Sequence, residues 1–135
     1  MNTFSKDLPI EYYGIDNEYN DLNATITEKI IHLPDNVKPK NIIRVYSNLD
    51  LIFNSENNTF KNIYYCICNV SLSIEYIDYN DDSTINIFND YIYCPLHFSI
   101  ANSFDINKFN PKISHIHLKL LNTSTIYIYL SISPY

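Results

Sequence analysis

Two cysteines placed two residues apart are the first candidates for chemistry in this chain. Cys66 and Cys68 lie in the run YYCICNVSLSIEYID, residues 64–78. A C-x-C pair can bind a metal, act as a redox switch or cross-link a neighbouring molecule. Paired zinc thiolates are usually spaced to reach one ion from a turn, whereas a strand projects both sulfurs in parallel. The alternating character of the run therefore favours two buried thiols on one face of a strand.

A third thiol, Cys94, leaves the cysteine chemistry open. It supplies no second pair for a metal site, and three cysteines leave at least one unpaired within the chain. Neighbours on one strand face lie about 6.6 Å apart at their Cα atoms, near the upper limit for a disulfide. Cys94 is therefore the only plausible partner for a bridge within the chain, and Cys66, Cys68 and Cys94 are candidate cross-links between subunits.

Two histidines form the second candidate group. His115 and His117, in SHIHL, share one face of an expected strand and are the weak candidates for a metal site. Alternating histidines on an exposed strand face are more often a solvated surface. We expect no cofactor.

Motifs for catalysis are missing from the sequence. The only glycine is Gly14, so neither a phosphate-binding P-loop nor a G-x-G-x-x-G turn can form. No serine lies in a glycine-flanked nucleophile turn. DYNDDS, residues 78–83, begins like a calcium loop, but Ser83 and Asn89 replace the glycine and glutamate that set its geometry. These observations predict a hairpin turn there and a protein that is not an enzyme.

The composition predicts one packed domain. The chain has 135 residues, 46% of them hydrophobic, and a net charge of -6 with nine scattered Lys and Arg. Clustered basic residues for nucleic acid are absent, and no apolar run is long enough to span a bilayer. The first residues are polar and acidic throughout, so we expect no signal peptide and synthesis in the cytoplasm.

Short alternating runs predict the elements that carry these residues. Strands are expected at 25–33, 48–54, 64–78, 84–100 and in a hairpin over 114–132, separated by polar turns such as 55–59. Pro39 suits the first turn of a brief helix. We predict an all-β fold, an antiparallel sandwich or barrel-like domain over residues 24–135, with at most one short helix.

Residues 1–23 show no sustained period and are predicted to be an N-terminal arm that is flexible or bridges subunits. Tyr12, Tyr13 and Ile15 are its candidate subunit contacts. The chain also has 13 tyrosines, and strand alternation places some of those in the expected strands outward. Exposed tyrosines favour interfaces, although β-propensity alone also accounts for them.

The span from Thr25 to Ile132 resembles the SPOCS domain of spore coat and spore envelope proteins. The resemblance lies in the order and spacing of ITEKIIHLPDNVKPKNIIRV, NVSLSIEYID and YCPLHFSI. Family members often have glycine where Asn69 stands, and many carry repeated copies or a peptidoglycan-binding LysM module. The family has no catalytic constellation to carry over.

The resemblance implies a structural protein of the bacterial spore surface, in the coat, exosporium or an appendage. It would be made in the mother cell and would assemble with itself or dock on other coat proteins, without nucleic acid or membrane insertion. A non-catalytic glycan- or peptide-binding module of the spore envelope, using outward tyrosines, is the alternative.

Overall fold

The computed structural model of the chain describes residues 11–14, 24–54, 63–99 and 109–134. Within these ranges it contains β-strands and no helix, as the sequence predicts for an all-β domain. The strands are β1 (Glu11–Gly14), β2 (Thr25–His32), β3 (Pro39–Asn54), β4 (Ile63–Asp78), β5 (Asp81–Ser99), β6 (Lys112–Asn122) and β7 (Thr125–Ser133). The predicted turn at 55–59 lies outside the described residues. A helix of the length and apolarity needed to cross a membrane is absent from the described ranges.

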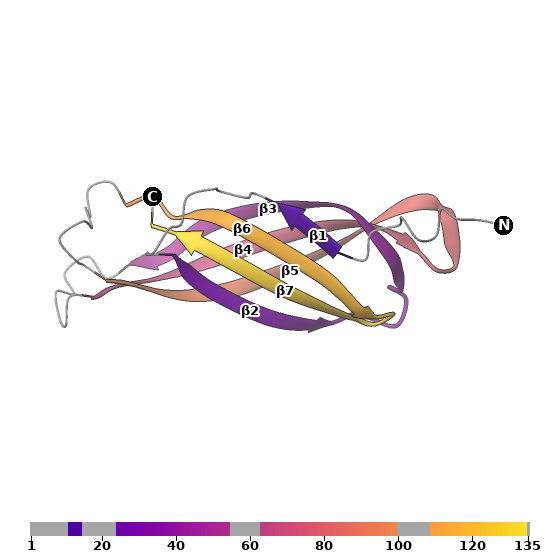
Figure 1. Ribbon diagram of the computed structural model, residues 1–135, viewed down its shortest axis with the longest axis horizontal. Coiled ribbons are helices and arrows are strands. Elements are labelled where there is room, and N and C mark those ends of the chain that lie inside the picture. The colour runs from indigo at the N-terminus through magenta and orange to yellow at the C-terminus, as the bar shows by residue number, and fades with distance from the viewer. Residues whose placement is uncertain (1–10, 15–23, 55–62, 100–108, 135) are drawn as a thin grey trace.

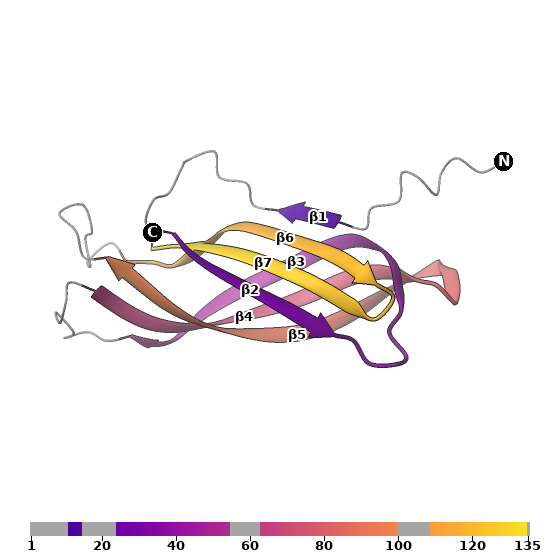
Figure 2. The ribbon, with the colours of Figure 1, turned by 60° about the horizontal axis from the view of Figure 1, so that its bottom comes forward.

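The strands form two antiparallel sheets that pack face to face as a β-sandwich (Figures 1 and 2). Sheet A has the strand order β1-β6-β7-β2, and sheet B has the order β3-β4-β5. At one long side of the sandwich β1 contacts β3, and at the other β2 contacts β5. The two sheets therefore approach each other along both sides of the core.

Alternation along β4 accounts for the inner face of sheet B. Every second residue points between the sheets, because successive side chains of a strand lie on opposite faces. The prediction that Cys66 and Cys68 share the core face is confirmed, since both are fully buried. Buried with them on β4 are Val70, Leu72, Ile74 and Tyr76.

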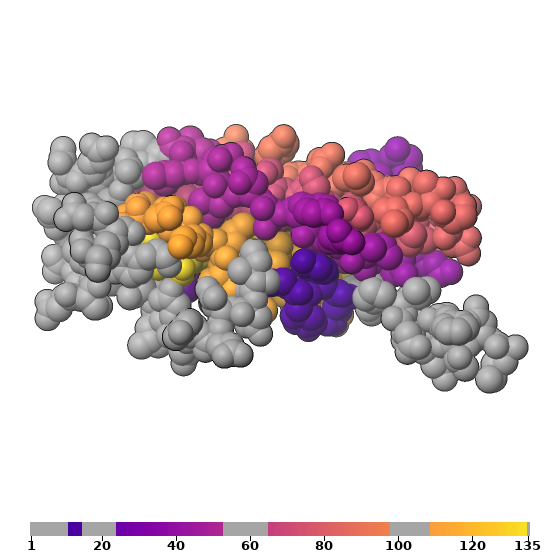
Figure 3. Space-filling view, turned by 90° about the horizontal axis from the view of Figure 1, so that it is seen from above, coloured from indigo at the N-terminus to yellow at the C-terminus, as the bar shows by residue number. Residues whose placement is uncertain are grey.

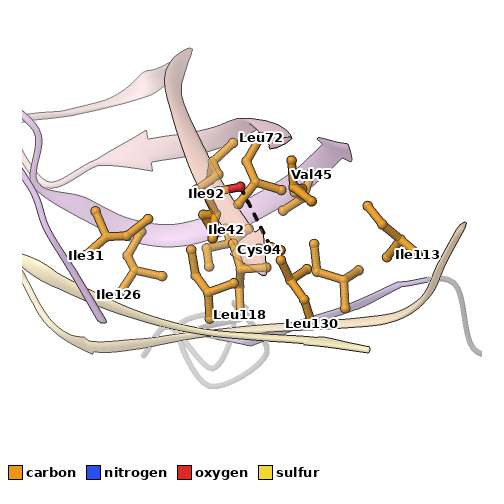
Figure 4. Packing of buried hydrophobic residues seen from close by; sticks show 14 of the residues in the cluster. Ile31, Ile42, Val45, Leu72, Ile92, Cys94, Ile113, Leu118, Ile126 and Leu130 are labelled. Atoms are coloured by element: carbon orange, nitrogen blue, oxygen red, sulfur yellow. Dashed lines mark hydrogen bonds between the residues drawn. The ribbon is translucent and has the colours of Figure 1, made fainter. Parts of the chain in front are cut away.

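Sheet A supplies the other half of the core through β6 and β7. Figure 4 shows Leu118 and Leu130 pointing towards residues of sheet B that include Ile92 and Cys94. Burying such aliphatic side chains contributes roughly 1.5 to 3 kcal/mol each. The apolar positions of this hairpin, Ile116, Leu118, Leu120, Ile126, Ile128, Leu130 and Ile132, are all buried.

The brief helix predicted near Pro39 is wrong. Pro39 opens β3 and faces Asp78 of β4 in the antiparallel register. A proline is tolerated at the first residue of an edge strand, where it removes no necessary hydrogen bond from the sheet. The strand expected at 48–54 is the second half of the same strand, which has three register shifts along β4.

The hairpin predicted at DYNDDS is confirmed. The carboxylate of Asp78 accepts hydrogen bonds from the backbone N–H groups of Asn80 at 2.8 Å and Lys38 at 3.2 Å. An aspartate that bonds to the backbone two residues later is a common way to build a tight turn. Asp78 thus joins the turn between β4 and β5 to the segment that leads into β3.

Candidate functional site at the edge of sheet A

Four candidate site residues, which come from two distant parts of the sequence, meet at one edge of sheet A. β1 carries Tyr12 and Tyr13, and it pairs with the part of β6 that includes His117, the Cα partner of Tyr13. His115 lies two residues earlier on β6. Figure 2 shows β1 as a separate short strand beside β6, and Figure 3 shows it against β3 as well. Ile15 lies outside the described residues.

The inner face of β1 extends the core. Tyr12 is opposite Leu118 and packs against the core cluster, and its hydroxyl donates to the backbone carbonyl of Val45 in β3 at 3.4 Å. Gly14 is opposite Ile116 on the same face. A Cβ atom on Gly14 would lie 2.8 Å from Tyr12 Cε1 and 2.9 Å from Ile116 Cγ2. The missing side chain is therefore what allows the Tyr12 ring to lie over this part of β6.

The outer face of β1 stacks on a histidine. The ring of Tyr13 lies parallel to that of His117, with 4.2 Å between centroids and 5° between planes. The Tyr13 hydroxyl donates to Glu11 Oε2 at 2.7 Å, and this hydrogen bond raises the pKa of Tyr13. Aromatic pairs of this kind contribute about 0.5 to 1.5 kcal/mol beyond the area that they bury. The stack fixes which face of β1 lies outward.

The outer face of β1 also brings Glu11 beside two side chains of β6, Lys119 and His117. Glu11 Oε1 lies 3.5 Å from Lys119 Nζ, and Glu11 Oε2 lies 3.5 Å from His117 Nε2. The hydrogen bond from Tyr13 and the neighbouring Lys119 lower the pKa of the Glu11 carboxyl group. His117 Nε2 is shielded from solvent and has no hydrogen-bond partner among the described residues, and Glu11 Oε2 lies beside it. We call the residues Glu11, Tyr13, His115, His117 and Lys119 the edge cluster.

Acid is expected to loosen β1 before it unfolds the sandwich. Because the folded-state pKa of Glu11 is depressed, its contribution is full above the ordinary value of 4.5 and is lost as the pH falls through the lowered value. Hydrogen exchange of the β1 amides, corrected for the intrinsic rate and divided by that of β7, should rise between pH about 6 and about 3. In Glu11→Gln, which has no carboxylate to protonate, this ratio should be higher than in the unmodified protein at pH about 6. It should also change less between pH about 6 and about 3. An identical pH profile in the two proteins would contradict the prediction.

The histidine pair belongs to an aromatic cluster. The ring of His115 meets that of Tyr129 edge-on at 5.7 Å between centroids, and His117 meets Tyr127 in the same way at 6.1 Å. Within the described residues, no group of three or more His, Cys, Asp or Glu side chains is arranged to hold a metal ion. The two histidines predicted as weak metal candidates thus lie together, and tyrosine rings and the Glu11 carboxylate lie beside them.

The three cysteines lie in the core, away from the edge cluster. Cys68 and Cys94 are Cα partners on β4 and β5, while Cys66 faces Leu96. All three are free and fully buried. Burial raises the pKa of Cys94. The hydrogen bond between Cys66 and Cys68, together with burial, raises the pKa of Cys66, while the same hydrogen bond lowers that of Cys68. Full burial keeps all three thiols out of reach of a neighbouring molecule, which argues against a cross-link between folded subunits.

The thiols are therefore expected to react only when the sandwich opens. Folded protein mixed with a thiol reagent such as 5,5′-dithiobis(2-nitrobenzoate) should release less than about one tenth of the colour that the denatured protein releases. The rate of the remaining reaction should follow the global unfolding rate as denaturant is added. Fast stoichiometric reaction in the absence of denaturant would contradict this burial.

A second group of aromatic side chains lies on the outer face of sheet B. Tyr46, Tyr91 and Tyr93 are 51%, 59% and 68% exposed. Their Cα partners on β4 are the small polar residues Ser73, Ser71 and Asn69. Tyr91 and Tyr93 point outward, as the sequence predicts for some of the tyrosines in strands. Tyr46 also contacts Arg44, whose guanidinium donates to its hydroxyl at 2.9 Å.

Three residues of the edge were not identified as functional candidates in the sequence. Glu11 and Lys119 are ordinary surface charges until the pairing of β1 with β6 places them opposite each other. Gly14 carried a signal, since it is the only glycine of the chain and follows two tyrosines. A glycine in a strand often marks a close approach of a neighbouring group.

Comparison with known proteins gives no relative for this arrangement. No protein-family model, curated protein or solved structure matches the chain.

Proposed function

We propose that the protein is a structural component of the bacterial spore surface, in the coat, exosporium or an appendage. In this proposal it is non-catalytic, and it assembles with itself or docks on other coat proteins through its β-domain and its N-terminal arm. The resemblance of residues 25–132 to the SPOCS domain supports the location. Synthesis in the mother-cell cytoplasm would precede its transfer to the spore.

The observation that carries this proposal is the pairing of β1 with the edge of sheet A. Glu11–Gly14 falls inside the segment predicted to be an arm, and it forms a strand on β6. An extended segment that adds to a sheet edge is a common means of joining proteins, because backbone hydrogen bonds supply affinity and side-chain pockets supply specificity. The arm thus contains a segment with both kinds of contact.

Electron microscopy and light scattering of the purified full-length protein test the assembly. We expect ordered oligomers or fibres whose mass grows with protein concentration. A matched protein lacking residues 1–23, checked for its β-sheet circular dichroism, should assemble less. A monodisperse monomer for both proteins at high concentration would overturn the proposal.

Immunogold labelling of whole and sectioned spores tests the location. Gold particles should lie over the coat, exosporium or appendages, and they should be absent from spores of a strain that lacks the gene. Labelling confined to the cytoplasm of growing cells would contradict a role at the spore surface.

A non-catalytic module that binds glycan or peptide is the second candidate function. The exposed tyrosines of sheet B favour it, because rings beside small polar neighbours can stack on a sugar or peptide while nearby hydroxyl and amide groups supply hydrogen bonds. Retention on spore-wall polysaccharide, lost in Tyr91→Ala/Tyr93→Ala and kept in Tyr79→Ala, would support this function. Equal retention of the unmodified protein, the double variant and Tyr79→Ala would exclude these tyrosines as the binding surface.

A further inference from the structure

The edge of β6 offers more strand than β1 uses. β6 spans 11 residues, and β1 pairs with the four from Ile116 to Lys119. On its other side β6 pairs with β7 over most of its length. Unpaired edge groups of a strand are a template for a further strand. Among the described residues, β1 is the strand that pairs with this edge of β6, over four of its 11 residues.

The site is specific for the sequence of β1. An occupant needs an aromatic ring that packs on the core and reaches the Val45 carbonyl, and a small residue two positions later opposite Ile116. On the outer face it needs a carboxylate opposite Lys119 and a ring to stack on His117. The segment EYYG meets all four requirements, and every copy of the chain carries it. The segment that fits this edge is therefore present in any second copy of the chain as well as in the chain itself.

The contacts of β1 are the same whether it belongs to the same chain or to another one. Exchange of an identical element between protomers keeps every contact at the site, so it costs little. The balance is then set by protein concentration and by the chain between β1 and β2. Ten residues separate Gly14 from Thr25 in the sequence, a length that can span roughly 35 Å when extended.

We infer that β6 of one copy accepts Glu11–Gly14 of another copy, in the register in which Glu11 is opposite Lys119 and Tyr13 is opposite His117. This inference rests on the proposed assembly function and names its partner and contact site. A mutual exchange gives a closed dimer, and a one-way transfer from copy to copy gives an open chain. In either form the edge cluster is built from two molecules.

Cross-linking between two full-length variants tests the exchange. Glu11→Cys and Lys119→Cys are made in separate chains, mixed at high concentration, unfolded and refolded together, and oxidised with glutathione disulfide. Each cross-link releases two thiol protons, and the two electrons reduce one glutathione disulfide to two glutathione molecules. Facing Cα atoms of an antiparallel pair lie about 4.5 to 5.5 Å apart, within the range of a disulfide.

The expected result is a covalent dimer that disappears on reduction and contains the peptides of residues 11 and 119. The matched control pairs Glu11→Cys with Leu121→Cys, on the same strand but about two positions away, and should give at least fivefold less dimer. The chain that carries both Glu11→Cys and Lys119→Cys measures the alternative, a bridge within one molecule. Equal dimer yields for the two mixtures, or a bridge found only within one chain, would overturn the exchange.

Nuclear magnetic resonance keeps the test decisive if a cysteine variant fails to fold. In an equal mixture of labelled and unlabelled unmodified protein, a filtered Overhauser signal between the Tyr13 and His117 rings is expected between molecules. Assembly by light scattering without this signal would reject the exchange and leave the proposed function standing. A protein that stays monomeric, with the signal only within one molecule, would reject both.

Discussion

Replacing Leu118 by alanine is expected to lower the free energy of unfolding by about 3 to 5 kcal/mol. A domain of this size has a total stability of roughly 5 to 15 kcal/mol, so the variant would lose a large share of it. Urea denaturation followed by circular dichroism measures the change, with the slope of the transition held equal between variants. The same transition also shows whether the variant still unfolds in one step.

The large effect follows from the position of Leu118 in the sandwich. Its side chain is fully buried, and its Cα partners are Tyr12 in β1 and Ile128 in β7. Figure 4 places it between the sheets, close to Leu130 and facing the residues of sheet B. Alanine would leave a cavity that β6, hydrogen-bonded on both sides at this point, cannot close by moving.

Leu121→Ala is the matched control for this substitution. Leu121 belongs to the same strand, but its side chain is 49% exposed. Its replacement should change the free energy of unfolding by at most about 0.5 to 1 kcal/mol. Equal losses for the two variants would mean that Leu118 does not occupy the core position described here.

Alternation made the core predictable from the sequence. In β4 the apolar positions recur at every second residue from Cys66 to Tyr76, and each of them is buried. Such a period belongs to the strand itself and needs no knowledge of its partners. The same reasoning located the hairpin of β6 and β7 and the turn at Asp78, whose chemistry is local to a few residues.

The edge cluster could not be predicted because its pairs are distant in the sequence. More than 100 positions separate Glu11 from Lys119 and Tyr13 from His117. The two histidines and the two tyrosines were identified separately, and only the register of β1 on β6 combines them. The helix predicted at Pro39 was wrong for a related reason. The role of this proline depends on its place in an edge strand of sheet B, which its neighbours in the sequence do not reveal.

Replacing Gly14 by valine is expected to release β1 from β6 while the rest of the sandwich stays folded. Hydrogen exchange of the amides in β1, and of the β6 amides that pair with it, should accelerate by about 10- to 100-fold, equivalent to about 1.4 to 2.7 kcal/mol. Exchange with mass-spectrometric detection measures this. The amides of β2 and β7, which pair with each other at the other side of sheet A, are the internal reference.

Gly14→Val should release β1 because there is no room beside Gly14 for the atoms of a valine side chain. A Cβ at this position would lie under 3 Å from the Tyr12 ring and from the Ile116 methyl group. Relieving both contacts requires the ring to leave its place beside Val45 or the strand to move away from β6. Because β1 is only four residues long, the loss of one anchoring ring removes a large part of what holds it.

A valine at an outward position of β1 separates the effect of steric crowding at Gly14 from the effect of valine's strand propensity. Glu11→Val has the same β-branched side chain in the same strand, and it removes the carboxylate's contacts with Lys119 and His117 and the hydrogen bond from Tyr13. Solvent screens the contacts of such an exposed carboxylate, so this variant should accelerate exchange by less than about fivefold. If Gly14→Val instead left the β1 amides as protected as before, the inner face of β1 would have room to spare. The specificity of the β6 edge for the sequence of β1 would then rest on the outer face alone, and the Glu11 and Tyr13 contacts would decide which chain it accepts.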